Sequence, residues 1–134
     1  KDLPLAPLNG RVRFVPDLSD ADKVALIDRA ALLVDASMDE GYGFPVLEAM
    51  SRGCPVAAAR TGALPEVCGE AAEYFDPRDA GSLASVLTRL LPDEQRLAEL
   101  SRRGRQRAET FSWERAARAH LEVYEEALGE TARP

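Results

Sequence analysis

DEGYGFPVLEAMSRGCPVAAARTGALPE, residues 39–66, combines a glycine-containing turn, the start of a helix and two glutamates in one short stretch. Pro45 suits the first helical position, where its missing N–H costs nothing. The two glycines of the turn allow backbone conformations that strain other residues, and they let a ligand approach the main chain. We therefore expect residues 41–44 to present free N–H groups at a helix N-terminus, which is a natural anion site.

Glu40 and Glu48 flank this turn, and we expect Glu48 to lie in the first turn of the helix, facing the anion site. A diphosphate would repel a carboxylate 4 Å away by roughly 4 kcal/mol at an effective dielectric of 20. A hydroxyl hydrogen-bonded to a charged group returns only about 1.5–3 kcal/mol. The glutamates should therefore point at hydroxyl groups on either side of the phosphates, as in a nucleotide sugar. The alternative is an ordinary loop-to-helix junction, whose acidic residues stabilise the positive helix end.

Short apolar segments alternate with helical patterns along the rest of the chain. A capping box formed by Ser19 and Asp22 predicts the first helix. Further patterns predict strands at 11–15, 32–36, 55–59 and 72–75, and helices at 45–53, 83–91, 93–109 and 112–128. This order predicts an α/β fold: a Rossmann-like, doubly wound parallel sheet, partial with about four strands, and a C-terminal helical tail.

The loops that follow two of these strands, residues 37–44 and 60–66, fall at the carboxyl ends where open α/β sheets bind ligands. The second loop either borders the ligand or simply caps a helix around Pro65 and Glu66. Both interpretations fit the sequence equally well.

The run EGYGFPVLEAMSRGCPVAAARTGALPEVCGEAAEYFDP, residues 40–77, resembles the donor-binding domain of retaining GT-B glycosyltransferases of the group 1 family (family 4). That family reads E-G-F-G-L-P-x-L-E-A-M-A-x-G-x-P-V, then G-x-x-P-E and D-P, and the likeness extends over residues 12–128. The resemblance implies that Glu40, the candidate catalytic residue, contacts the donor sugar and that Glu48 contacts the ribose. It implies that the backbone facing the sugar and diphosphate is that of Gly41, Tyr42, Gly43 and Phe44. Tyr42 and Phe44 depart from the family's commoner Phe and Leu.

The resemblance further implies a hexosyltransferase that moves a sugar from a nucleotide-diphosphate donor to an acceptor hydroxyl with retention, using no cofactor and no metal. The family supplies an Arg, a Lys and an N-terminal acceptor domain from earlier in the chain. Residues 11–134 are thus expected to be the later part of the nucleotide-sugar-binding C-terminal domain, inactive alone, and residues 1–10 a linker or chain edge. Without its neighbouring strands, the segment 11–15 should be irregular. A non-catalytic nucleotide-sugar-binding module, an assembly domain, and a GT-B epimerase or phosphorylase remain alternatives.

The composition argues against some other classes of binding partner. The 134 residues are 46% hydrophobic and 30% charged, and the net charge of −6 argues against nucleic acid, which requires a basic face. Cys54 and Cys68 lack metal-ligand spacing and are expected to be buried thiols in a reducing compartment. We expect a cytoplasmic protein. Peripheral contact of the full-length protein with the inner face of a membrane is the alternative.

Several side chains late in the chain have competing interpretations. His120, the sole histidine, lies on the apolar stripe of the last helix, which favours hydrogen-bonded packing over catalysis. Trp113 and Tyr124 share that stripe and are expected to lie in the core. A basic cluster suggests a solvated helix face, or alternatively a phosphate or membrane contact; it comprises Arg102, Arg103, Arg105 and Arg107.

Overall fold

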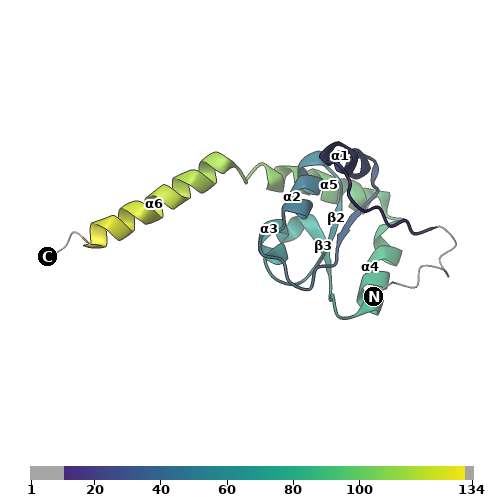
Figure 1. The fold of residues 1–134 in the computed structure, drawn as a ribbon. Coiled ribbons are helices and arrows are strands. Elements are labelled where there is room, and N and C mark those ends of the chain that lie inside the picture. The colour runs from purple at the N-terminus through teal and green to yellow at the C-terminus, as the bar shows by residue number, and fades with distance from the viewer. Residues whose placement is uncertain (1–10, 132–134) are drawn as a thin grey trace.

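A computed structural model describes residues 11–131, with side chains through residue 129. Its sheet has three parallel strands in the order β1-β2-β3: β1 (Leu33–Asp35), β2 (Val56–Ala59) and β3 (Ala72–Phe75). The helices are α1 (Asp20–Arg29), α2 (Phe44–Arg52), α3 (Leu64–Cys68), the 3-10 turn η2 (Gly69–Ala71), α4 (Ala80–Leu90), α5 (Glu94–Ala108) and α6 (Trp113–Thr131) (Figure 1). The predicted α/β fold with a parallel sheet and a C-terminal helix is confirmed.

The segment before α1 differs from the predicted strand. Residues 11–18 have no regular secondary structure, so the strand predicted at 11–15 is wrong, whereas its expected irregularity is confirmed. Phe14 of this segment is 79% exposed. An alternating pattern forms a strand only where a neighbouring strand completes the hydrogen-bonded ladder, and the described sheet gives this segment none. The linker predicted at residues 1–10 lies outside the described residues.

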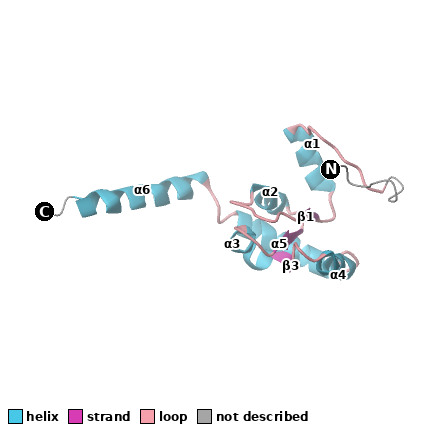
Figure 2. Ribbon diagram, turned by 60° about the horizontal axis from the view of Figure 1, so that its bottom comes forward, coloured by secondary structure: helices cyan, strands magenta, loops and turns pink. Residues whose placement is uncertain are grey.

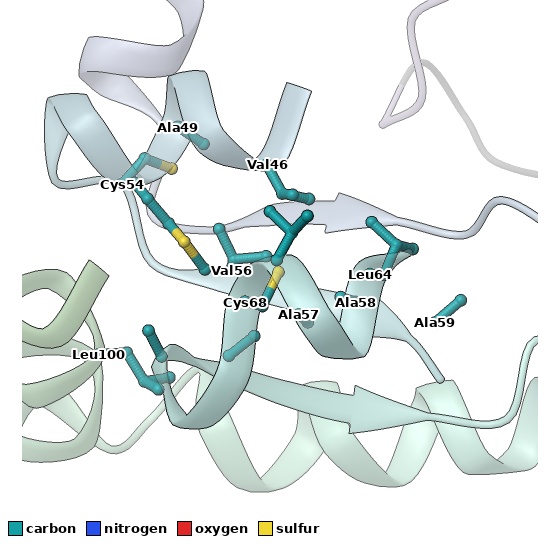
Figure 3. Packing of buried hydrophobic residues seen from close by; sticks show 14 of the residues in the cluster. Val46, Ala49, Cys54, Val56, Ala57, Ala58, Ala59, Leu64, Cys68 and Leu100 are labelled. Carbon is teal, nitrogen blue, oxygen red and sulfur yellow. The ribbon is translucent and has the colours of Figure 1, made fainter. Parts of the chain in front are cut away.

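The middle strand, β2, carries the sequence Val-Ala-Ala-Ala, which has poor intrinsic strand propensity. It pairs with β1 on one side and β3 on the other, and none of its four side chains is exposed to solvent. Figure 3 shows side chains of α2, α3 and α5 gathered around it: Val46, Ala49, Leu64, Cys68 and Leu100. Its position in the sheet thus overrides its propensity, and small side chains let the helices approach closely.

Helix α5 packs directly on α2. Gly104 of α5 is buried, and a Cβ added there would lie 3.2 Å from Cγ of Met50, a side chain wholly excluded from solvent. The lack of a side chain at Gly104 therefore lets α5 approach α2 closely at this point.

The last helix, α6, extends away from the rest of the domain in both Figure 1 and Figure 2. Trp113 is 78% exposed and Tyr124 is 59% exposed, so the prediction that they lie in the core is wrong. Their helical spacing does define an apolar face, but the described residues place no other element over most of it. Ser112 caps the helix as expected, since its Oγ accepts the N–H of Arg115.

Three of the four clustered arginines hold α5 to its neighbours rather than forming only a solvated face. Arg107 donates to the carbonyl oxygens of Glu66 (2.7 Å) and Val67 (2.9 Å), which are in α3. Arg105 reaches the carbonyl of Arg52 in α2, and Arg103 pairs with Glu70 and Glu99. Arg102 bonds only along its own helix, to Gln106. The cluster is thus mainly structural.

Glu73 on β3 is the centre of a charge network that joins the sheet to two helices. Its carboxylate lies 2.8 Å from Arg89 Nη2 on α4 and 2.7 Å from Arg96 Nη2 on α5, with its side chain 13% exposed. Burial by itself raises the pKa of this carboxyl. The hydrogen bonds from both guanidinium groups outweigh that effect and hold the pKa below its ordinary value of 4.5.

Replacing this carboxylate by an amide, Glu73→Gln, is expected to lower the free energy of unfolding by about 1–2 kcal/mol at neutral pH. The group's lowered folded-state pKa means that its contribution is complete above its unfolded pKa and is lost as pH falls through the folded value. The difference between wild type and variant should therefore shrink below pH 4.5. Urea unfolding between neutral and strongly acid pH measures it; a difference independent of pH would contradict the expectation.

Candidate functional site

The loop between β1 and α2 carries Glu40 at the carboxyl edge of the sheet, as predicted. At its start, Oδ1 of the buried Asp35 accepts the N–H of Ser37 at 3.0 Å, forming a turn that leads the chain out of the strand. At its end, Gly43 has a left-handed backbone (φ 94°), and Pro45 stands in the first turn of α2. The sequence features that predicted a turn followed by a helix are therefore confirmed.

The carboxylate of Glu40 folds back onto its own loop. Its Oε1 accepts the N–H of Tyr42 at 3.2 Å and the N–H of Gly43 at 3.0 Å. These two N–H groups are not free, so the predicted anion site of open amides is wrong at these positions. The reason is local: a carboxylate two or three residues upstream reaches these donors as it would at a helix N-cap. Within the described residues, no hydrogen bond to Oε2 is found.

The second loop, which follows β2, lies against the main chain of the first. Ala63 donates its N–H to the carbonyl oxygen of Glu40 at 2.9 Å, and the Oγ1 of Thr61 donates to the carbonyl of Met38 at 3.1 Å. Gly62 has φ +51°, and a Cβ placed there would lie 2.5 Å from the same Glu40 oxygen. The two carboxyl-end loops therefore pack backbone against backbone at Glu40.

The far end of the second loop forms a short helix. Pro65 lies in the first turn of α3, together with Glu66. A helix therefore starts at these two residues, as the capping interpretation expects, although its N-cap residue, Ala63, makes no side-chain hydrogen bond. That the loop borders the ligand stays a prediction. No signal in the sequence indicated that the preceding residues of the loop would hold Glu40.

Glu48 lies on α2, but not in its first turn as predicted. The helix begins at Phe44, which makes Glu48 its fifth residue, and the first turn holds no acidic residue. The Oε2 of Glu48 is 3.3 Å from Nζ of Lys23 on α1. The hydrogen bond to Glu48, together with a second one to Asp20, raises the pKa of the Lys23 ammonium. No pattern in the sequence indicated that this lysine would lie beside Glu48.

A hollow of about 490 Å³ lies along the outer side of α2 and contains Glu48 but not Glu40. Its walls come from α1, the loop before α2, α2 itself, the end of α5, the connection to α6 and the start of α6. They are formed by Lys23, Tyr42, Phe44, Leu47, Glu48, Ser51, Ala108, Phe111, Ser112, Trp113 and Ala116. The rings of Tyr42 and Phe44 stack with centroids 4.4 Å apart, and Trp113 lies 6.3 Å from Phe44. The predicted turn thus supplies two aromatic walls beside the second glutamate.

The remaining candidate residues lie apart from this region. Cys54 and Cys68 are buried free thiols, as predicted, and burial raises the pKa of Cys68 to about 12. His120 is exposed on α6, with Nδ1 2.7 Å from the carbonyl oxygen of Ala116, so it is hydrogen-bonded but not packed in a core. Across residues 11–131, no three metal-binding side chains gather at one point, and no helix has the length and apolarity to cross a membrane.

This chain resembles known proteins over most of its length. The family model for glycosyl transferases group 1 matches residues 5–107. The chain is 42% identical over 119 residues to the MMP alpha-(1->4)-mannosyltransferase of Mycolicibacterium hassiacum, covering 86% of this chain and 29% of that protein. It is 39% identical over 128 residues to the D-inositol 3-phosphate glycosyltransferase of Salinispora tropica, covering 92% of this chain and 26% of that protein.

Solved structures show the same likeness. Sucrose-phosphate synthase from Thermosynechococcus elongatus superposes with a TM-score of 0.80 at 29% identity, covering 94% of this chain and 33% of that one. The C-terminal domain of a glycosyl transferase group 1 family protein (LpcC) from Francisella tularensis gives 0.61 at 28% identity, covering 74% and 51%. The chain spans about a third or less of the length of the curated relatives it matches. Because the family model matches residues 5–107, the chain belongs to the glycosyl transferases group 1 family.

Proposed function

We propose that this chain is the later part of the donor-binding domain of a GT-B glycosyltransferase. The whole enzyme would transfer a hexose from a nucleotide-diphosphate sugar to an acceptor hydroxyl, with retention at the anomeric carbon. An acceptor domain outside these residues would complete the active site. The observation that carries the proposal is that one loop-and-helix unit carries two carboxylates: Glu40 on the loop after β1, and Glu48 on α2 beside the aromatic-walled hollow.

The geometry supports different tasks for the two carboxylates. Glu40 has Oε1 engaged by two backbone N–H groups, which leaves Oε2 to accept a hydroxyl of the donor sugar. Glu48 lines the aromatic-walled hollow and would accept the ribose hydroxyls, with Lys23 at its side. A carboxylate accepts hydroxyl donors well and repels phosphate, so both roles suit the polyol parts of a nucleotide sugar.

The diphosphate requires positive charge that this turn does not supply. Since Glu40 occupies the N–H groups of Tyr42 and Gly43, the main chain of residues 41–44 can contribute less than open amides would. We therefore assign most of the charge compensation to cationic side chains elsewhere in the full-length protein. This assignment agrees with the Arg and Lys that the family pattern places earlier in the domain.

Calorimetric titration of the full-length protein with UDP-glucose, GDP-mannose and ADP-glucose tests the proposal. With the donor that binds, Glu48→Gln should weaken both the nucleotide sugar and its nucleoside diphosphate by about 10- to 100-fold. Glu40→Gln should weaken the nucleotide sugar alone. Glu122→Gln, on the exposed surface of α6, serves as the control for loss of a negative charge. Equal affinity of all variants for all ligands would show that the two carboxylates do not form a donor site.

A further inference from the structure

We propose that Thr61 and Gly62 are positioning residues: they hold Glu40 at the sugar end of the donor site through its main chain, without touching the ligand. The inference rests on the proposed role of Glu40 and goes beyond it, because it assigns a function to a loop that the donor need not contact. Three separate contacts join the two loops. The same contacts leave Glu48 untouched.

The first observation is how the second loop encloses the main chain around Glu40. Thr61 donates to the carbonyl of Met38, which lies two residues before Glu40, and Ala63 donates to the carbonyl of Glu40 itself. Between these bonds, Gly62 faces the Glu40 peptide so closely that a Cβ would stand 2.8 Å from its nitrogen and 2.5 Å from its oxygen. Position 62 therefore has no room for a side chain, and the two hydrogen bonds restrain the main chain of residues 38–40.

The second observation is that the enclosing loop is itself anchored to the sheet. Thr61 donates its N–H to the carbonyl of Ala59, the last residue of β2, at 2.9 Å. Arg60 donates its N–H to the carbonyl of Phe75, the last residue of β3, at 2.9 Å. On its other side the loop continues into Leu64, which is fully buried. A site placed on such rigid elements keeps its geometry more accurately than one carried by a free loop.

The third observation is that the two glutamates depend on different supports. Glu40 is held by the loop after β2, whereas Glu48 belongs to α2 and pairs with Lys23 on α1. Removing the Thr61 hydroxyl should therefore disturb the sugar end of the site and leave the ribose end in place. This separation gives a measurable signature, because a nucleoside diphosphate lacks the sugar and should not sense the change.

The test compares Thr61→Val, which keeps the shape of the side chain and removes its donor, with Thr61→Ser, which keeps the donor. Full-length protein is titrated with GDP-mannose and GDP, and with UDP-glucose and UDP, and melting temperatures are recorded. For the pair that binds wild type, Thr61→Val should reduce the preference for the nucleotide sugar over its nucleoside diphosphate by about 3- to 10-fold. Affinity for the nucleoside diphosphate should not change, and Thr61→Ser should restore the preference.

Thr88→Val, at an exposed position of α4, is the matched control and should behave as wild type. An unchanged preference in Thr61→Val would overturn the inference while leaving the proposed donor site intact. An equal loss of affinity for the nucleotide sugar and the nucleoside diphosphate, with a lowered melting temperature, would also overturn the inference. It would show that Thr61 stabilises the fold as a whole. Failure of the wild type to bind any of these nucleotide sugars would instead remove the proposed function on which the inference stands.

Discussion

Alanine in place of Gly62 is expected to reduce sugar transfer by the full-length protein about 100-fold, because Glu40 would be displaced from its working position. The new Cβ would lie 2.5 Å from the carbonyl oxygen of Glu40, far inside van der Waals contact, and the obstructing atoms are backbone. The peptide of Glu40 must then shift, and its carboxylate must shift with it. Steady-state kinetics with the donor identified by titration measures the loss.

A second glycine separates this displacement from backbone strain. Gly69 also has a positive φ, +54° against +51° for Gly62, but a Cβ there would meet only the Nε of Arg107 at 3.8 Å. Alanine at position 69 would be strained because of the positive φ, so Gly69→Ala should lose about 1–3 kcal/mol of stability and keep its transfer rate. If Gly62→Ala and Gly69→Ala lowered activity equally, strain rather than the position of Glu40 would be the cause.

Valine in place of Gly104 is expected to lower the free energy of unfolding by about 2–3 kcal/mol. Its Cβ would lie 3.2 Å from Met50 Cγ and 3.5 Å from Met50 Cα, and the two added methyl groups need further room. Met50 is fully buried, so it can move only by disturbing the packing of α2 on α5. Overpacking of this kind costs about 1–3 kcal/mol. Thermal and urea unfolding measure the change.

Gly129 provides the matched control, since it also lies within a helix but a Cβ there would meet nothing within 4 Å. Gly129→Val should be neutral or stabilising by about 0.3 kcal/mol, because valine is a slightly better helix former than glycine. A destabilisation of similar size in both variants would indicate a general effect of β-branching in helices. The contact between α2 and α5 would then not be the limiting feature.

Much of the fold follows from local patterns in the sequence. The strands at residues 33–35, 56–59 and 72–75 and the caps at Ser19, Gly53 and Ser112 agree with prediction to within a residue or two. Local patterns fail where a partner decides the outcome. Residues 11–15 alternate like a strand, but no strand of the described part of the chain lies beside them. Likewise, no described element covers most of the apolar stripe of α6.

In the candidate site, too, local features could be predicted from the sequence and long-range contacts could not. The turn at Gly43 and the helix start at Pro45 are local, and the sequence predicts them. The hydrogen bonds that Oε1 of Glu40 accepts from its own loop are also local. The sequence interpretation missed them because it expected this carboxylate to face a ligand. The contact of Lys23 with Glu48 joins residues 25 positions apart, and no pattern in one sequence encodes such a distance.

The alanines of β2 restrict how this domain can change over evolutionary time. Ala57, Ala58 and Ala59 are shut off from solvent entirely, with strands on both edges. An added methylene at any of them would have to be matched by a smaller side chain on a facing helix. Each alanine can therefore be replaced only together with a residue of that helix. The loop that encloses Glu40 begins directly after Ala59. A shift of β2 caused by poor packing against the helices would therefore also shift this loop and the main chain of Glu40.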